Sequence, residues 1–199
     1  MKSDANKEWT VLLIGGTCGI GKSSAARALA QRYSVPFLEL DDLRIAAQAM
    51  VPRDALPALH AFVETPNYRE TSSSEALTEK LLSVGRTLWP AIDAVISKHV
   101  HLGERVLMEG DALIPEALAP HSQQAVATVF LYDDLDTIKA RQMERDRHGK
   151  AAETIDADAA FSFAYSEEIR KQAEQCGFPV LRASPIETLA DRIEALLVR

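Results

Sequence analysis

Short apolar runs alternate with longer amphipathic stretches along the whole chain. Short runs of this kind are typical of buried strands, whereas apolar positions that recur every three or four residues are typical of helices. The run at residues 125–132 is nearly continuous in apolar residues, as expected for a parallel strand that is covered on both faces. The predicted strands are residues 9–15, 35–40, 105–108, 125–132 and 178–182.

The stretches between these runs predict helices. The longest one, at residues 74–100, carries an apolar stripe and contains Pro90, where we expect a bend. The stripe could cover the sheet or form a dimer seam, and we prefer the first because a parallel sheet needs helices on its faces. The predicted helices are residues 22–33, 74–100, 158–176 and 185–198, a helix that follows Asp42 and runs to about residue 50, a short helix after Pro115, and a helix capped by Asp133 and Asp134 that runs to about Arg145.

The order of these elements indicates an α/β fold with a five-stranded parallel sheet and helices on both faces. With 199 residues the chain suits a single domain, residues 1–199. Prolines interrupt the pattern at residues 52–74, and this segment is too short to bury a core of its own. We expect it to be a helical excursion that faces the substrate.

Composition and charge narrow the class of partner. A net charge of −7 argues against nucleic-acid binding, because proteins that bind the phosphate backbone usually present a basic face. The two cysteines, Cys18 and Cys176, form neither a disulfide framework nor a metal cluster, which favours the reducing cytoplasm. No apolar run approaches the ~20 residues needed to span a bilayer. We expect a cytoplasmic protein with a small-molecule partner and no nucleic-acid or membrane partner, and the oligomeric state stays open.

A glycine-rich stretch follows the first predicted strand directly. It reads Gly-Thr-Cys-Gly-Ile-Gly-Lys-Ser at residues 16–23 and fits the pattern G-x-x-x-x-G-K-[ST]. Glycines at these points let successive backbone N–H groups converge on phosphate oxygens. Lys22 would reach the β- and γ-phosphates of ATP, and Ser23 would offer its hydroxyl to Mg²⁺. The alternative, a glycine-rich turn with a chance lysine, leaves the flanking strand and helix unexplained. The expected nucleotide-binding residues are Gly16, Thr17, Cys18, Gly19, Ile20, Gly21, Lys22, Ser23 and Ser24.

Ligands of open α/β sheets bind at the carboxyl ends of the strands, so the residues that follow each strand are informative. Asp41, Asp42 and Arg44 follow the second predicted strand. Asp41 could bind Mg²⁺ or accept a proton from a substrate hydroxyl, and Arg44 could bind a substrate phosphate or carboxylate. The alternative role for one of the two aspartates is to cap the next helix. We expect Asp41 to be functional in catalysis, and Asp42 and Arg44 to face the substrate.

Glu109, Gly110 and Asp111 follow the third predicted strand, where P-loop proteins usually place an acidic residue near the metal. Glu109 is expected to orient Mg²⁺ or to bind a substrate hydroxyl. Gly110 and Asp111 form either part of the substrate site or a solvated turn. Arg86 on the long helix is a further candidate for substrate binding, although isolated helical arginines are usually solvated.

The densest basic cluster of this acidic chain lies near the end of the predicted helix that follows the fourth strand. Arg141 and Arg145 are four residues apart and therefore share a helical face. Arginines in such a place can close over a transferring phosphoryl group. The alternative is a salt-bridged surface helix. We expect an Arg-bearing lid at residues 141–156, with Arg141 and Arg145 acting in catalysis. The rest of the cluster is Arg147, His148 and Lys150.

This organisation resembles the small P-loop kinases of the nucleoside-monophosphate and shikimate kinase type, and more narrowly the 2-phosphoglycerate kinase group. The phosphate loop is shared by many NTPases, whereas the segments Leu-Pro-Ala-Leu-His and Leu-Met-Glu-Gly-Asp-Ala-Leu-Ile-Pro narrow the match. The resemblance covers nearly the whole chain. The segments that carry it are residues 15–24, 41–44, 56–60 and 107–115.

The resemblance implies a three-layer P-loop kinase fold with ATP and Mg²⁺ as cofactors. It also implies transfer of the γ-phosphoryl group to a small-molecule acceptor, with 2-phosphoglycerate as the named candidate. The roles that it implies are the acceptor side for Asp41 and Arg44, the nucleotide and metal for Lys22 and Ser23, and the lid for Arg141 and Arg145.

Two positions depart from the pattern of that group. Asp111 stands where its members often carry histidine, and Cys18 replaces a small hydroxyl residue. Because Asp111 bears on the acceptor, the alternatives within enzymes are kinases of nucleosides, nucleotides or antibiotics. The alternative from another class is a nucleotide-binding switch without an acceptor. The sequence lacks an Asn-Lys-x-Asp motif for reading guanine, which favours ATP over GTP.

Overall fold

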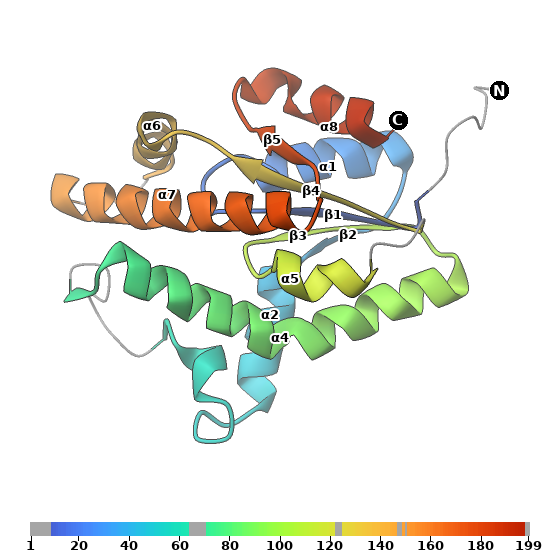
Figure 1. Cartoon of the computed structure of the whole chain (residues 1–199), viewed down its shortest axis with the longest axis horizontal. Coiled ribbons are helices and arrows are strands. Elements are labelled where there is room, and N and C mark those ends of the chain that lie inside the picture. Colours follow the sequence, from blue (N-terminus) through green and yellow to red (C-terminus); the bar gives the residue numbers. More distant parts are fainter. Residues whose placement is uncertain (1–8, 64–70, 122–124, 147–148, 150, 198–199) are drawn as a thin grey trace.

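The computed structural model describes residues 9–63, 71–121, 125–146, 149 and 151–197. Within these residues five strands form one sheet in the order β2-β3-β1-β4-β5, and every neighbouring pair is parallel (Figure 1). The predicted parallel sheet is therefore confirmed. The strands are β1 (Val11–Gly16), β2 (Phe37–Glu39), β3 (Val106–Gly110), β4 (Val126–Tyr132) and β5 (Val180–Arg182).

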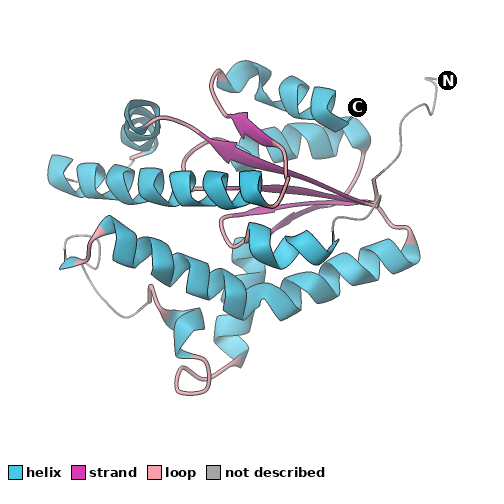
Figure 2. Ribbon diagram, in the orientation of Figure 1, coloured by secondary structure: helices cyan, strands magenta, loops and turns pink. Residues whose placement is uncertain are grey.

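Helices cover both faces of this sheet. Helices α1 and α8 lie on one face, and α4, α5 and α7 lie on the other (Figures 1 and 2). This arrangement is the expected three-layer α/β architecture. The helices are α1 (Lys22–Tyr33), α2 (Leu40–Met50), α4 (Ser74–Leu102), α5 (Pro115–Leu118), α6 (Leu135–Arg145), α7 (Ala152–Gln175) and α8 (Leu189–Leu197), with 3-10 turns η1 (Pro57–His60), η2 (Ala119–His121) and η3 (Ile186–Thr188).

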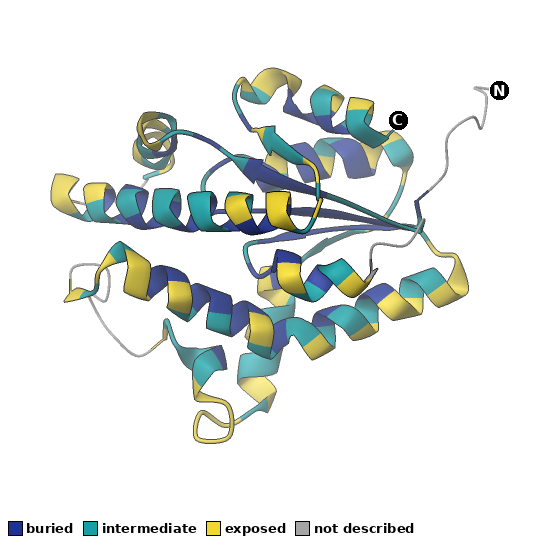
Figure 3. Ribbon diagram, viewed as in Figure 1, coloured by how far each residue is buried: buried dark blue, intermediate teal, exposed yellow. Residues whose placement is uncertain are grey.

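The central strand β1 divides the core in two. Leu12 and Ile14 pack among residues of α1 and α8, whereas Val11 and Leu13 pack among residues of α4 and α7. Successive side chains of a strand point to opposite faces, so a strand in the middle layer must be apolar at every position. Figure 3 shows the buried residues concentrated in the sheet and on the helix faces that meet it. The continuous apolar run of β1 thus follows from its place in the middle layer.

Helix α4 is the main cover of one face. Its apolar stripe is buried against the sheet, including Leu77, Leu81, Leu88 and Ile92, so the covering role predicted for the stripe is confirmed. Pro90 lies inside the helix, and the helix changes direction along its length (Figure 1). A proline removes one backbone hydrogen bond and crowds the preceding turn, which accounts for a bend there.

The predicted caps of two helices need correction. Helix α2 begins at Leu40 with Glu39 at its N-cap, so neither Asp41 nor Asp42 caps it; both lie in its first turn. Asp134 caps α6 by accepting a hydrogen bond from the Thr137 N–H at 2.8 Å. Asp133, the other predicted cap residue, accepts from arginine side chains and does not cap the helix. Carboxylates in a first helical turn are still stabilised by the helix dipole.

Helix α7 begins at Ala152, inside the expected lid and before the predicted start at residue 158. Its first turns are rich in alanine, a strong helix former, and Ile155 is buried. The segment between α6 and α7 is therefore shorter than the sequence pattern predicts. Of the basic residues expected there, Arg147, His148 and Lys150 lie outside the described residues.

The described part of the segment 52–74 packs as an excursion on α2 and α4. Leu59 is buried in the core on the α4 side of the sheet. The Gln48 amide donates to the Leu59 carbonyl at 2.8 Å, and the His60 ring nitrogen lies 2.9 Å from the Val51 carbonyl. Residues 64–70 lie outside the described residues, so the substrate-facing role of the segment stays a prediction.

Among the described residues, no helix combines the length and the apolar character that crossing a bilayer requires.

We predict that Leu13→Ala lowers the free energy of unfolding by about 2–5 kcal/mol, because the truncation leaves a cavity in the core between β1 and the helices α4 and α7. The matched control is Ile45→Ala, which truncates an aliphatic side chain that is 59% exposed and should change stability by less than about 0.5 kcal/mol. Urea denaturation of both variants measures the difference. Equal losses would contradict the layer assignment.

Candidate active site

The phosphate loop connects β1 to α1. Gly16 and Gly21 adopt positive φ angles of 133° and 94°, which side chains rarely allow. A Cβ atom at Gly16 would lie 2.5 Å from the Leu131 carbonyl oxygen, so the loop also leaves no space for a side chain there. Gly21 is the N-cap of α1, and the first N–H groups of that helix have no partner within the helix. The loop and the helix end together form a backbone cradle for an anion.

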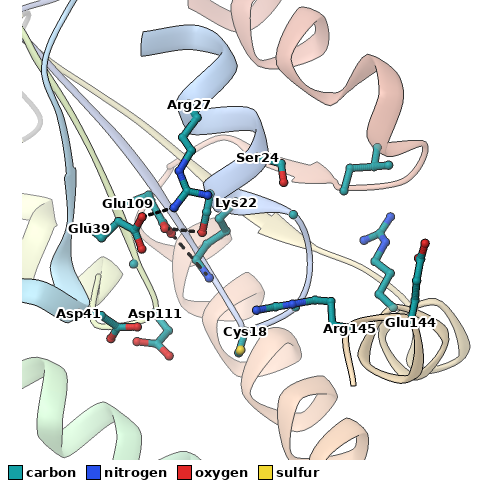
Figure 4. A pocket seen from close by; sticks show the side chains of 16 residues that line it. Cys18, Lys22, Ser24, Arg27, Glu39, Asp41, Glu109, Asp111, Glu144 and Arg145 are labelled. Carbon is teal, nitrogen blue, oxygen red and sulfur yellow. Dashed lines mark hydrogen bonds and ion pairs between the residues drawn. The ribbon is translucent and has the colours of Figure 1, made fainter. Parts of the chain in front are cut away.

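This cradle opens into a cavity of about 610 Å³. The cavity lies at the carboxyl ends of the strands, where open α/β sheets bind ligands (Figure 4). It brings together the phosphate loop, the β2–α2 junction, the end of β3 and the end of α6. Its lining residues are Cys18, Gly19, Gly21, Lys22, Ser23, Ser24, Arg27, Glu39, Asp41, Glu109, Gly110, Asp111, Arg141, Glu144, Arg145 and Ile186.

Lys22, Ser23 and Glu109 form the centre of the cavity. The Ser23 hydroxyl donates to Glu109 Oε1 at 2.6 Å, and Lys22 Nζ lies 3.9 Å from Glu109 Oε2. Lys22 Nζ also donates to the Thr17 carbonyl at 2.8 Å, so the ammonium is held over the loop. Burial raises the pKa of the Glu109 carboxyl, and the nearby Lys22 ammonium and the Ser23 hydrogen bond oppose this shift.

Parallel pairing sets the position of Glu109. Glu109 is inside β3, in register with Ile14 of β1 and with Glu39 of β2, and it is buried. The predicted end of this strand at residue 108 is therefore too early. The pairing with β1 places the carboxylate next to the first residues of the phosphate loop.

The oxygen donors at this centre suit Mg²⁺ bound together with a polyphosphate. A hydroxyl and a carboxylate are hard ligands, and Mg²⁺ in nucleotide sites commonly takes few protein ligands and completes its shell with phosphate and water oxygens. No group of three or more His, Cys, Asp or Glu side chains able to hold a metal occurs within the described residues. The Ser23 hydroxyl and the Glu109 carboxylate fit a nucleotide-bound metal, and Asp41, the other expected metal ligand, pairs with Arg44 at 2.9 Å.

Asp111 and its neighbours form the wall of the cavity at the end of β3. A Cβ atom at Gly110 would lie 2.7 Å from Leu40 Cβ, so glycine allows the start of α2 to pack directly on the end of β3. The Tyr165 hydroxyl donates to the Asp111 carbonyl oxygen from helix α7. Oδ1 of the Asp111 side chain is buried and has no hydrogen-bond partner. Burial raises the pKa of the Asp111 carboxyl; the Lys22 ammonium opposes this and the Asp41 carboxylate adds to it.

The structure brings some of the expected substrate residues into the cavity and leaves others out. Asp41 lines it and faces Asp111 (Figure 4). Arg44 lies behind Asp41, with its guanidinium 2.9 Å from Asp41 Oδ1. Asp42 is exposed and is not among the lining residues. Arg86 pairs with Glu79 at 2.8 Å and likewise does not line the cavity.

The two arginines expected in the lid have different environments. Arg141 donates to the Ile20 carbonyl at 3.2 Å, to Asp133 Oδ2 at 3.0 Å and to the Ser184 hydroxyl at 2.9 Å. It therefore ties the phosphate loop to the ends of β4 and β5. Arg145 is exposed, and its NH1 lies 3.8 Å from where a Cβ atom of Gly19 would be.

Sequence reasoning missed Asp133. Its side chain is fully buried and also accepts from Arg182 Nε at 3.0 Å and from the Ser184 hydroxyl at 2.6 Å. The sequence shows two adjacent aspartates before a helix, which indicates a cap. The only sequence signal for its ion pairs is that Asp133 directly follows a buried strand, where functional side chains of α/β sheets gather.

Sequence reasoning also missed the pair formed by Arg27 and Glu39, which closes one side of the cavity. Arg27 lies one turn into α1, and its guanidinium is 5.4 Å from the Phe37 ring centre. The pair connects α1 to β2, two elements that no local pattern brings together.

Comparisons with known proteins agree with this geometry. The family model described as "ATPase family associated with various cellular activities (AAA)" matches residues 12–157, which is most of the chain and includes the phosphate loop and Glu109. The chain belongs to this ATPase family. The assignment of residues 16–23 as a nucleotide-binding loop is therefore supported by the sequence motif, the geometry and the family.

Individual relatives of this chain are named as kinases. It is 23% identical over 187 residues to a 2-phosphoglycerate kinase of Pyrococcus furiosus, a match that covers 89% of this chain and 60% of the relative. The chain thus spans less than two thirds of that relative's length. The resemblance to the 2-phosphoglycerate kinase group that the sequence indicates is confirmed.

Solved structures show the same fold. Shikimate kinase from Bacteroides thetaiotaomicron superimposes with a TM-score of 0.54 at 20% identity, covering 94% of this chain and 98% of the kinase. A gluconokinase from Sinorhizobium meliloti superimposes with a TM-score of 0.51 at 19% identity, covering 98% and 94%. The expected P-loop kinase fold is therefore confirmed.

We predict that Asp133→Asn destabilises the protein by about 3 kcal/mol, because two arginines lose their buried carboxylate. The control Asp136→Asn makes the same chemical change on the exposed surface of α6 and should shift stability by less than about 0.5 kcal/mol. Denaturant unfolding measures both values. A loss for Asp133→Asn no larger than that of the control would refute a structural role for the network.

We predict that Asp111→Asn stabilises the nucleotide-free protein more at pH 8 than at pH 4.5. The folded-state pKa of Asp111 is raised, so its contribution to stability is present below the unfolded pKa and is lost as the pH rises through the folded pKa. The amide does not titrate and escapes this loss. Calorimetry in EDTA should show a melting-temperature difference between the variant and the parent protein that is a few degrees larger at pH 8 than at pH 4.5. For a chain of this size, a stability change of 1 kcal/mol shifts the melting temperature by about 2–4 °C. A pH-independent difference would contradict the prediction.

Proposed function

We propose that this protein transfers the γ-phosphoryl group of ATP to a hydroxyl group of a small metabolite. The observation that carries the proposal is that one cavity holds both the phosphate loop with Lys22 and a second wall with Asp41 and Asp111. Carboxylates on a cavity wall next to the phosphate loop can orient an acceptor hydroxyl and take its proton. The similarity to kinases in sequence and in fold supports the same reading.

The residues of this chain would divide the work as follows. The loop N–H groups, Lys22 and Arg145 would bind the phosphates and stabilise the charge that develops during transfer. Asp41 would orient the acceptor hydroxyl and take its proton while the oxygen forms a bond to the γ-phosphorus. The bond between that phosphorus and the β,γ-bridging oxygen breaks, and ADP leaves.

Ser23 and Glu109 would hold the metal of the nucleotide. Mg²⁺ bound there would supply positive charge to the β- and γ-phosphates. Glu109 would act mainly by orienting the ion, because its own oxygen accepts the Ser23 hydroxyl at 2.6 Å.

We also propose that the segment with Arg141 and Arg145 acts as a lid. This lid is shorter than the predicted residues 141–156, because α7 already begins at Ala152. Arg141 would hold the loop in shape through the Ile20 carbonyl, and Arg145 would face the phosphates directly.

We also propose that the chain forms one domain and acts in the cytoplasm. Its two cysteines, Cys18 and Cys176, are free thiols, which fits a reducing compartment.

The relatives give the first acceptor to test. The P. furiosus relative is named a 2-phosphoglycerate kinase, which makes 2-phosphoglycerate the reference compound for this chain. Nucleosides, nucleotides and antibiotics are the next classes. The test measures ADP formation from Mg-ATP with and without each compound, and stimulation by at least one of them is the expected result.

A second candidate function is favoured by the family match. The family is described by its ATPase activity, so the protein could instead be a nucleotide-dependent switch that has no acceptor. In that case ADP would form at the same rate with every compound tested. Acceptor-dependent ADP formation, with a phosphorylated product in equal amount, distinguishes the two functions.

We predict that Lys22→Met lowers acceptor-dependent ADP formation by at least about 100-fold, because the charge that stabilises the transferring phosphoryl group is lost. The control Lys139→Met removes a half-buried lysine on α6 that pairs with Asp156 outside the cavity lining, and it should leave the rate within about twofold. Circular dichroism checks that both variants are folded. Substantial phosphoryl transfer by a folded Lys22→Met variant would defeat the assignment.

A further inference from the structure

We propose that one turn of α7 sets the spacing between the two halves of the candidate active site. The donor half is the phosphate loop with the end of α6, and the acceptor half is the wall at the end of β3. Gln142 contacts this turn from the donor half, and Tyr165 extends from it to the acceptor half; neither residue lines the cavity. Both would be positioning residues. The inference rests on the proposed function and adds the element that aligns its two substrates.

Tyr165 fixes the backbone of the acceptor half. Its side chain is fully buried, and its hydroxyl donates to the Asp111 carbonyl oxygen. Asp111 follows the last residue of β3, so this carbonyl takes its partner from a helix and not from a neighbouring strand. On the other side, Gly110 packs closely on Leu40. The peptide that carries the Asp111 side chain is therefore held between α7 and the start of α2.

The Asp111 carboxylate depends on this backbone support. Its Oδ1 is buried and has no hydrogen-bond partner. The direction of the side chain is therefore set mainly by the backbone to which it is attached. Loss of the Tyr165 hydroxyl would leave a buried carbonyl without its partner and loosen a carboxylate that lies beside Asp41 in the cavity wall (Figure 4).

Gln142 holds the donor half from the same helix. Its Nε2 on α6 donates to the hydroxyl of Ser162, a buried residue of α7, at 2.9 Å. A Cβ atom at Gly19 would lie 3.4 Å from Gln142 Cγ, so the side chain fills the space between the phosphate loop and α7. Arg145, one turn further along α6, lies beside the same glycine. Gln142 therefore sets how closely this arginine approaches the loop.

The two contacts meet on one helix. Ser162 and Tyr165 are three residues apart on α7 and are therefore neighbours on its surface. The helix has 24 residues and runs along the sheet, with α6 beside its first half (Figure 1). Phe161 and Ile169 anchor it in the core. Phosphoryl transfer needs the reacting atoms within about 3–3.5 Å of each other, so the separation that α7 maintains bears directly on the rate.

The alternative is that these hydrogen bonds only satisfy buried polar groups. Their loss would then lower the stability and the folded fraction of the protein. KM does not depend on the amount of active protein, so a comparison of KM for the two substrates separates positioning from stability.

The test uses the full chain, Mg-ATP and the compound that gives the highest rate among 2-phosphoglycerate, nucleosides, nucleotides and antibiotics. Tyr165→Phe removes only the hydroxyl, and it should raise KM for the acceptor about fivefold and leave KM for ATP within about twofold. Gln142→Leu removes the amide, and it should raise KM for ATP about fivefold and leave KM for the acceptor within about twofold.

Matched controls make the same changes away from the cavity. Tyr33→Phe alters a tyrosine at the end of α1, and Gln172→Leu alters a glutamine of α7 that donates to Glu168 at 2.8 Å. Both should leave each KM within about twofold. Circular dichroism measures the folded fraction of every variant, by which kcat is corrected.

The double variant tests whether α7 links the two halves. Each single variant should lower kcat about tenfold, and two independent changes would together lower it about 100-fold. We expect the double variant to lose no more than about 30-fold, because either change already releases the spacing that the other maintains. A full 100-fold loss, unchanged KM values, or equal shifts of both KM values would contradict the inference and leave the proposed function standing. No acceptor-dependent ADP formation by the parent protein with any compound would overturn both.

Discussion

The parallel pairing of β1 between β3 and β4 is the constraint on which the candidate site depends. It aligns Ile14 with Glu109 and Gly15 with Gly110, so the phosphate loop and the acidic end of β3 emerge side by side from the sheet. Close packing fixes this register, because a Cβ atom at Gly15 would lie 2.4 Å from Phe130 Cδ1 and a Cβ atom at Gly16 would lie 2.5 Å from the Leu131 carbonyl oxygen, so only glycine fits at these two positions. The chemistry at the carboxyl end is thus held in place by packing in the middle of the sheet.

The charged groups of the site oppose the stability of the fold that carries them. Glu109 is buried, and Asp111 has a buried oxygen without a partner, and burial raises the pKa of both carboxyls. Such groups are retained in proteins where function needs them, and the rest of the structure makes up the deficit. Here the compensation comes from the two apolar cores on either side of the sheet.

The fold and the nucleotide half of the site could be predicted from the sequence, because both depend on local patterns. Apolar periodicity located the five strands, and the spacing of the glycines with Lys22 and Ser23 located the loop. The roles of Asp133 and Arg27 could not be predicted, since each is defined by partners from elements distant in sequence, such as Ser184 and Glu39. The predicted start of α7 is too late because acidic residues, Glu153, Asp156 and Asp158, interrupt the apolar positions of its first two turns.

The contact between the phosphate loop and the residues that follow β5 has an evolutionary consequence. A Cβ atom at Gly21 would lie 2.4 Å from Ile186 Cδ1, and Arg141 joins the Ile20 carbonyl to the Ser184 hydroxyl. A bulkier side chain at position 186 would press on a loop whose shape leaves little freedom to adjust. Positions near the two ends of the sequence should therefore vary together among descendants of this protein, although a motif search would treat them as unrelated.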